Sequence, residues 1–71
     1  MITATRLDGS RFAVNPDLIE RVQASPDTTL HTVGGQVFVI KETLEEAVAL
    51  IVAYRAQVLV AAHALISTQE V

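Results

Sequence analysis

The 71-residue chain contains no cysteine and no tryptophan, and only one tyrosine and two phenylalanines. The absence of cysteine excludes a disulfide framework, a thiolate nucleophile and a cysteine-based zinc site. Basic residues are also few: five Lys and Arg stand against eight Asp and Glu, giving a formal net charge of −3. We therefore expect no surface that neutralises nucleic-acid phosphates. The first residues contain no apolar run of signal-peptide length, which predicts a cytoplasmic protein.

The chain is short and rich in apolar residues. Apolar residues make up 51% of the sequence and charged residues 18%, which excludes an intrinsically disordered chain. A domain of this size has a core that barely offsets the conformational entropy lost on folding, so such domains usually need disulfides, a metal or a partner subunit. Cysteine is absent, and only His31 and His63 are available as strong metal ligands. A partner subunit is therefore the expected source of additional stability.

The pattern of the chain changes once, near Lys41, and we predict one α+β domain over 1–71. Residues 1–41 consist of short β-branched runs separated by turn residues, which predicts a small antiparallel β-meander of four to five strands. Residues 43–67 contain no glycine or proline, and we expect them to form one long C-terminal α-helix.

Turn residues set the boundaries of the predicted strands. Asp8-Gly9 predicts a type I′ hairpin turn, which needs a positive φ at both central positions, and Gly34-Gly35 predicts a second tight turn. Asn15 is expected to cap a single helical turn that includes Ile19, because the spacing of Ile19 and Val22 fits a helical turn better than a strand.

The strongest strand signal is Gln36–Ile40. Both of its faces, Val37 with Val39 and Phe38 with Ile40, are apolar. We therefore expect both sides of this strand to be covered.

The predicted helix is the most informative element. Thr43 and Glu46 have the spacing of a capping box at its start. Apolar side chains extend over about 200° of the helical wheel, wider than the stripe of an ordinary surface helix. A helix of about 23 residues is about 34 Å long, whereas strands of five or six residues span only about 17–20 Å. The apolar segment Ala56–Ile66 should therefore extend beyond the sheet with nothing in the chain to cover it.

This overhang predicts a homo-oligomer formed through the helix. The spacing of Leu44, Val48, Ile51, Arg55, Val58, Ala62 and Leu65 alternates between four and three residues, as in a coiled-coil seam. The interface that we predict consists of Val52, Arg55, Val58, Leu59, Ala62, Leu65 and Ile66.

Arg55 lies inside this apolar stripe and has two interpretations. It can lie at the edge of an oligomer interface or of the sheet and pair with a glutamate, or it can fix the register or number of the subunits. It also bears on membrane insertion, because the apolar stretch 47–66 is near the length that spans a bilayer. A charge near the middle of that stretch, with Gln57 and His63 beside it, makes insertion unfavourable. We expect at most a peripheral association with membranes.

The sequence contains no recognisable catalytic constellation. His31 and His63 do not have the spacing of a zinc-binding helix, and no serine lies in a nucleophile elbow. Helix capping and the helix dipole account for Glu42, Glu45 and Glu46. We expect no enzymatic activity, no cofactor, no metal site and no small-molecule substrate.

Several short motifs follow one another in the chain. Leu7-Asp8-Gly9 precedes Phe12 and Asn15-Pro16-Asp17-Leu18-Ile19-Glu20; Pro26-Asp27-Thr28, a glycine-containing turn and Lys41-Glu42-Thr43 with Glu45-Glu46 follow. In order and spacing this series resembles the FlbD/SwrD family of small flagellar and swarming-motility proteins, over residues 1 to about 54. The resemblance assigns the family motif to Asp8, Gly9, Asn15, Pro16, Asp17, Lys41, Glu42 and Thr43.

The resemblance implies a role in flagellar motility without enzymatic activity or a cofactor. Together with the predicted oligomer, it suggests a cytoplasmic protein-binding module that contacts a flagellar motor, stator or basal-body protein at the inner face of the membrane. The alternatives are a small regulatory or nucleic-acid-binding β protein, which the net charge disfavours, and a membrane-surface adaptor. The chain departs from the family where Gly34-Gly35 replaces Asn-Gly, and after Tyr54, where relatives are shorter and rich in lysine.

Overall fold

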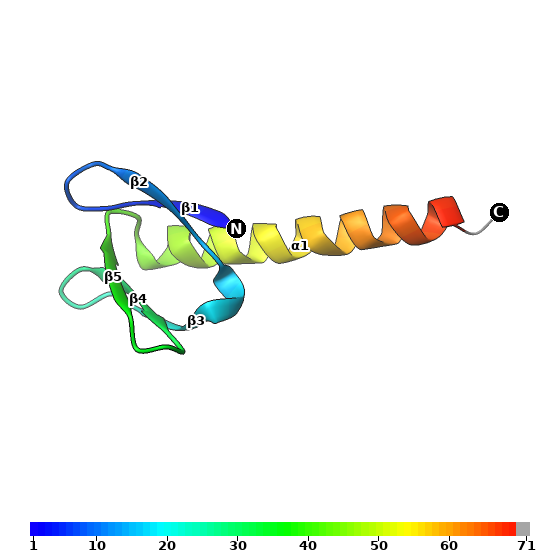
Figure 1. The fold of residues 1–71 in the computed structure, drawn as a ribbon. Helices are drawn as coiled ribbons and strands as arrows, with labels where there is room; N and C mark the ends of the chain where they lie inside the picture. The colour runs from blue at the N-terminus through cyan, green and yellow to red at the C-terminus, as the bar shows by residue number, and fades with distance from the viewer. Residues whose placement is uncertain (70–71) are drawn as a thin grey trace.

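The protein folds into five short strands and one long C-terminal helix (Figure 1). The structure, a computed structural model, describes residues 1–69, and it describes side chains through residue 66. The elements are β1 (Ile2–Thr5), β2 (Arg11–Val14), the 3₁₀ turn η1 (Pro16–Leu18), β3 (Ile19–Gln23), β4 (Thr28–Thr32), β5 (Val37–Ile40) and α1 (Leu44–Gln69).

The five strands form two antiparallel sheets instead of the single meander that we predicted. β1 pairs with β2, and β3, β4 and β5 pair in that order. The ladder stops between β2 and β3 because η1 occupies the connection, and its Pro16 has no N–H to donate. A bridge between Arg6 and Ile40 and a 2.8 Å hydrogen bond from the Lys41 N–H to the Thr5 carbonyl connect the two sheets. The α+β class and the strand number are confirmed.

The β1–β2 hairpin closes through a turn other than the type I′ turn that Asp8-Gly9 suggested. The Gly9 N–H donates to the Arg6 carbonyl at 2.9 Å, and the Arg6 N–H donates to the Ser10 carbonyl at 2.8 Å. Within the described residues a positive φ occurs only at glycine, here at Gly9 with a φ of 92°. This is a three-residue loop, in which one glycine in the left-handed region lets the strands re-pair.

The β4–β5 connection repeats this arrangement. The Gly35 N–H donates to the Thr32 carbonyl at 3.1 Å, and the Thr32 N–H donates to the Gln36 carbonyl at 2.9 Å. Gly35 has a φ of 86°, whereas Gly34 is not in the left-handed region. The predicted tight turn is therefore present, and its conformation depends on the second glycine.

The predicted helical turn ends before Ile19. The Asn15 side chain accepts a hydrogen bond from the Asp17 N–H at 3.0 Å, so the predicted cap is confirmed. Ile19 is already the first residue of β3, and the prediction that placed it in the turn is wrong. The register of β3 against β4 shifts between Ile19 and Arg21. This irregularity adds a residue to β3 and lets Ile19 and Val22, three apart, both pack against the core.

The core lies between the two sheets and the first half of α1. Phe12 and Phe38 meet across the sheets with their ring centroids 5.2 Å apart. Val37 and Val39 are 52% and 36% exposed, so β5 is covered on only one face, contrary to our expectation. The buried apolar residues are Ile2, Ala4, Val14, Leu30, Ile40 and Ala47.

α1 begins at the predicted capping box. The Thr43 N–H donates to Glu46 Oε1 at 3.0 Å, and the Glu46 N–H donates to Thr43 Oγ1 at 3.1 Å. The first three turns pack against the β-sheets through Ala47, Leu50, Ile51 and Tyr54.

After Tyr54 the helix leaves the β-sheets and extends away from them, as Figure 1 shows. The molecule measures 52 × 23 × 19 Å, and its radius of gyration is 14.7 Å, whereas a compact chain of this length has about 11 Å. Every described side chain from Arg55 to Ile66 is exposed. The predicted overhang of Ala56–Ile66 is therefore present in the single chain.

Candidate partner-binding groove at the start of the helix

Three of the sequence motifs meet where β5 leads into α1. Leu7, the segment Pro26–Thr28 and the segment Lys41–Thr43 line one open groove of about 410 Å³. We call this the motif groove, and its remaining walls are Ala24, Ile40, Leu44 and Glu45. Leu7 and Thr43 are 36 positions apart in the chain, so sequence spacing gave no indication that these segments would form one surface.

Glu42 holds this corner of the molecule together. Its Oε1 accepts a hydrogen bond from the Thr5 N–H at 2.9 Å, and its Oε2 accepts one from Thr5 Oγ1 at 2.8 Å. Burial raises the pKa of the Glu42 carboxyl. The two hydrogen bonds from Thr5, a hydrogen bond from its own backbone and the nearby positive charge of Arg11 together lower that pKa by more, so it lies below its ordinary value. Helix capping therefore accounts for Glu46, as predicted, but not for Glu42, which ties the end of β1 to the start of the helix.

The rim of the motif groove is predominantly acidic. Asp27 and Glu45 are exposed on it, and Lys41 is the cation there. The wall is partly apolar, because Leu7 is 51% exposed and Leu44 is half-buried. The groove therefore suits a segment that carries both apolar and basic side chains.

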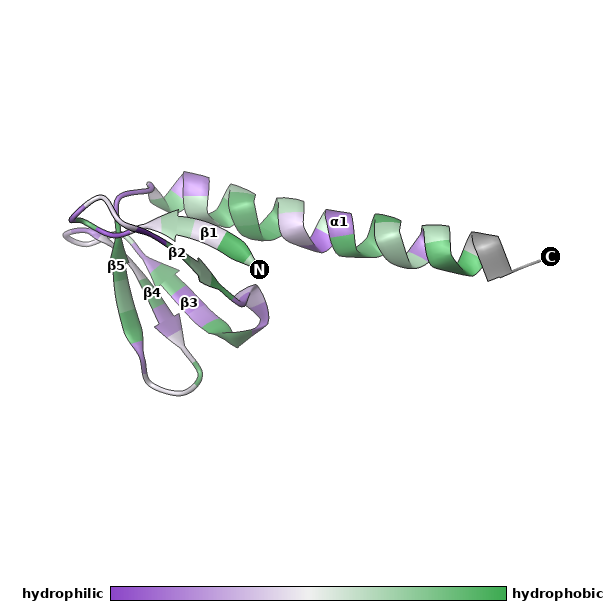
Figure 2. Cartoon of the chain, turned by 45° about the horizontal axis from the view of Figure 1, so that its top comes forward, coloured by the Kyte–Doolittle hydropathy of each residue, from purple (hydrophilic) through white to green (hydrophobic). Residues whose placement is uncertain are grey.

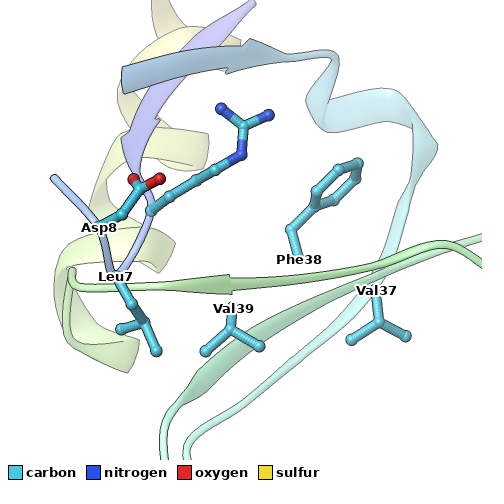
Figure 3. A pocket seen from close by; sticks show the side chains of 6 residues that line it. Leu7, Asp8, Val37, Phe38 and Val39 are labelled. Carbon is cyan, nitrogen blue, oxygen red and sulfur yellow. The ribbon is translucent and has the colours of Figure 1, made fainter. Parts of the chain in front are cut away.

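An apolar strip continues from the motif groove along β5. Figure 3 shows the side chains of Leu7, Val39 and Val37 on one side of the strand, and that of Phe38 on the other. Leu7 also lines the neighbouring hollow of about 330 Å³, together with Arg6, Asp8 and residues of β5. The Arg6 guanidinium lies 4.3 Å from the centroid of the Phe12 ring. Arg6, which lines this hollow, therefore already makes a cation–π contact within the chain.

The other predicted motif residues lie elsewhere. Asp8 is at the tip of the first hairpin, where hydrogen bonds from the Ser10 hydroxyl at 2.7 Å and N–H at 2.9 Å lower its pKa. Asn15 caps η1, which begins with Pro16 and Asp17. Asp17 lines a different groove with Tyr54 and Arg55 of α1. Structural roles in turns and caps therefore account for Asp8, Gly9, Asn15 and Pro16.

The two histidines lie on different elements. His31 Nε2 lies 3.2 Å from Thr29 Oγ1 within β4, and His63 is exposed on the projecting part of α1. Within the part of the chain that the structure describes, no three His, Cys, Asp or Glu side chains come together as metal ligands would.

The predicted interface residues all lie on one long exposed stretch of α1. Leu59 is 70% exposed, Val52 60% and Val58 48%. Arg55, Ala62, Leu65 and Ile66 are exposed as well. Figure 2 shows that apolar residues dominate this part of the helix.

Comparison with known proteins identifies a family. The model of the FlbD family, described as flagellar and swarming motility proteins, matches residues 1–59. The chain matches no curated protein and no solved structure. The matched range includes the whole motif groove and ends at Leu59, within the exposed part of α1.

Proposed function

Because the chain belongs to the FlbD family of flagellar and swarming motility proteins, we propose that it is a non-enzymatic motility accessory protein that binds another flagellar protein as an oligomeric module. The observation that carries this proposal is the convergence of Leu7, Pro26–Thr28 and Lys41–Thr43 on one open groove. The partner is a cytoplasmic segment of a motor, stator or basal-body protein.

The chemistry of the groove specifies what this segment must contain. The rim carries two exposed carboxylates, Asp27 and Glu45, and one ammonium group, Lys41. A partner segment with Lys or Arg beside apolar residues would pair with the rim and cover Leu7. The strip formed by Val37 and Val39 offers further apolar surface for the same segment.

The charge of the rim can be tested in cells. Deletion of the gene should abolish swimming or swarming while flagellar filaments, counted by electron microscopy, remain. A gene with Asp27→Lys and Glu45→Lys should fail to restore motility, because the rim then repels a basic segment. Both side chains are exposed, and circular dichroism of the purified variant should match the parent chain.

The matched control changes an acidic residue outside the groove. Glu20→Lys alters the net charge in the same direction at an exposed position of β3 and should restore motility. Full motility with the folded double variant would refute the role of the groove, and loss of filaments on deletion would move the function from the motor to assembly.

A membrane-surface adaptor is the second candidate, and the exposed helix favours it. Leu44–Ile66 is long and apolar enough to cross a membrane, judged by length and composition. Sedimentation of the full chain with lipid vesicles tests this candidate.

A further inference from the structure

A second groove lies where α1 leaves the β-sheets. Asp17 of η1 lines it on one side, and Tyr54, Arg55, Val58 and Leu59 of α1 form the rest of an open hollow of about 290 Å³. We call it the exit groove. The helix face that packs on the sheets through Tyr54 continues past this groove into Val58 and Leu65, which are 48% and 63% exposed.

The exposed part of α1 is too short to span a bilayer. Residues 55–69 form only about 22 Å of helix, less than the about 30 Å of a hydrocarbon core. The preceding turns are held to the sheets, and Ala47 is 1% exposed, so they cannot supply the missing length while the fold stays intact. Arg55 is the only basic side chain other than histidine on α1, which is too few for attraction to anionic lipids.

We propose that the exit groove takes the end of α1 from a second copy of this chain, in an antiparallel helix pair centred on Ala62. In this arrangement Leu59 lies opposite Leu65 of the second copy, and Val58 lies opposite its Ile66. The side chains of Leu65 and Ile66, which are 63% and 56% exposed in one chain, then enter the groove beside Tyr54. This inference rests on the oligomeric part of the proposed function.

The position of Arg55 selects the antiparallel direction. In a parallel pair in register, Arg55 would face Arg55 of the second copy within an apolar seam, and the two charges would repel each other. In the antiparallel pair it lies beside the helix end of the second copy, at Gln69. The last described turn there has no basic residue, and the negative end of the helix dipole favours a cation nearby.

The first experiment measures mass and uses a matched pair of variants. Sedimentation equilibrium of the full chain should give a dimer, twice the 7.6 kDa of one chain. Leu59→Asp should weaken the dimer by about 100-fold, because it buries a charge in the pair. Val60→Asp lies on the opposite side of the helix, where Val60 is 69% exposed, and should leave the dimer unchanged.

The second experiment determines the direction of the pair. The chain has no cysteine, so introduced cysteines are its only thiols. A mixture of Leu59→Cys and Leu65→Cys chains should oxidise mainly to the mixed disulfide, whereas Leu59→Cys alone should cross-link poorly. Efficient cross-linking of Leu59→Cys with itself would show a parallel pair and overturn this inference.

The outcomes separate this inference from the proposed function. A parallel dimer or a higher oligomer would refute the antiparallel pair and leave an oligomeric module in place. A monomer would refute both the pair and the oligomeric part of the function. A monomer that sediments with vesicles of phosphatidylcholine and phosphatidylglycerol would identify the bilayer as the occupant instead.

Discussion

Glu42 joins two parts of the chain that lie 37 residues apart, since both carboxylate oxygens accept hydrogen bonds from Thr5. Hydrogen bonds to an ionised group contribute more than neutral ones. Replacing Glu42 with glutamine should therefore destabilise the fold by about 1–2 kcal/mol, measured by urea denaturation. Glu45→Gln removes the same charge from an exposed position and should change the free energy of unfolding by less than about 0.5 kcal/mol. Equal losses in the two variants would contradict the role given to Glu42.

The same carboxyl should make stability depend on pH. The pKa of Glu42 is lower in the folded chain than its ordinary value of 4.5, so its contribution is complete above that value and is lost as pH falls through the lowered pKa. The free energy of unfolding should decrease as pH falls past the ordinary pKa of 4.5 and on through the lowered pKa of the folded chain. Asp8 also has a lowered pKa, so the comparison is made with Asp8→Asn in both chains. In that background Glu42→Gln should flatten the decrease, and an unchanged slope would contradict the assignment.

Spacing along the chain predicted the local contacts of single residues but not the distant ones. The capping box of Thr43 and Glu46 and the cap at Asn15 were predictable because each joins residues two or three apart. The bond between Glu42 and Thr5 depends on how two sheets dock, which no local pattern encodes. The same reason explains why the motif groove was not foreseen.

The two hairpin loops each depend on one glycine. Gly35 has a φ of 86°, and adding a Cβ there meets no neighbouring atom, so only the backbone conformation opposes a side chain. Gly35→Ala should destabilise the fold by about 1–2 kcal/mol. The neighbouring Gly34→Ala should be neutral or stabilising by up to about 1 kcal/mol, because Gly34 is outside the left-handed region and its Cβ would lie 3.9 Å from Thr32 Oγ1. In thermal denaturation the Tm of Gly35→Ala should lie below that of the parent chain, and the Tm of Gly34→Ala should lie at or above it. An equal change of Tm in the two variants would refute this description of the loop.

Most of the elements were predictable, and their pairing was less so. β-Branched runs and turn residues predicted four to five strands and one helix, and the structure has five strands and one helix. The prediction of a single meander failed at η1. A short turn can interrupt the pairing of two strands without changing the sequence pattern of either strand. The prediction for Ile19 failed for a related reason. Ile19 and Val22 are three residues apart yet share one face of β3, because the register shifts between Ile19 and Arg21.

The division of α1 into a packed and a projecting half has a consequence for the whole molecule. Among the side chains that the structure describes, those of the buried apolar residues lie at or before Ala47, and the family match ends at residue 59. A chain that ends at residue 59 should therefore fold, with the circular dichroism spectrum of its sheets intact, and should have a Tm that does not depend on concentration. The Tm of the full chain should rise by several degrees for a tenfold increase in concentration, because association stabilises the folded state. A concentration-independent Tm in the full chain would contradict self-association.

Because α1 is one uninterrupted helix of 26 residues, the orientation of its projecting half is fixed relative to the half that packs on the β-sheets. Each residue inserted between them turns the far end by about 100° and advances it by about 1.5 Å. Two inserted residues would turn the distal face to nearly the opposite side of the helix. Seven inserted residues would return it almost to its original direction, about 10 Å farther from the β-sheets. The direction in which the distal face points relative to the β-sheets is therefore set by the number of residues that follow Tyr54.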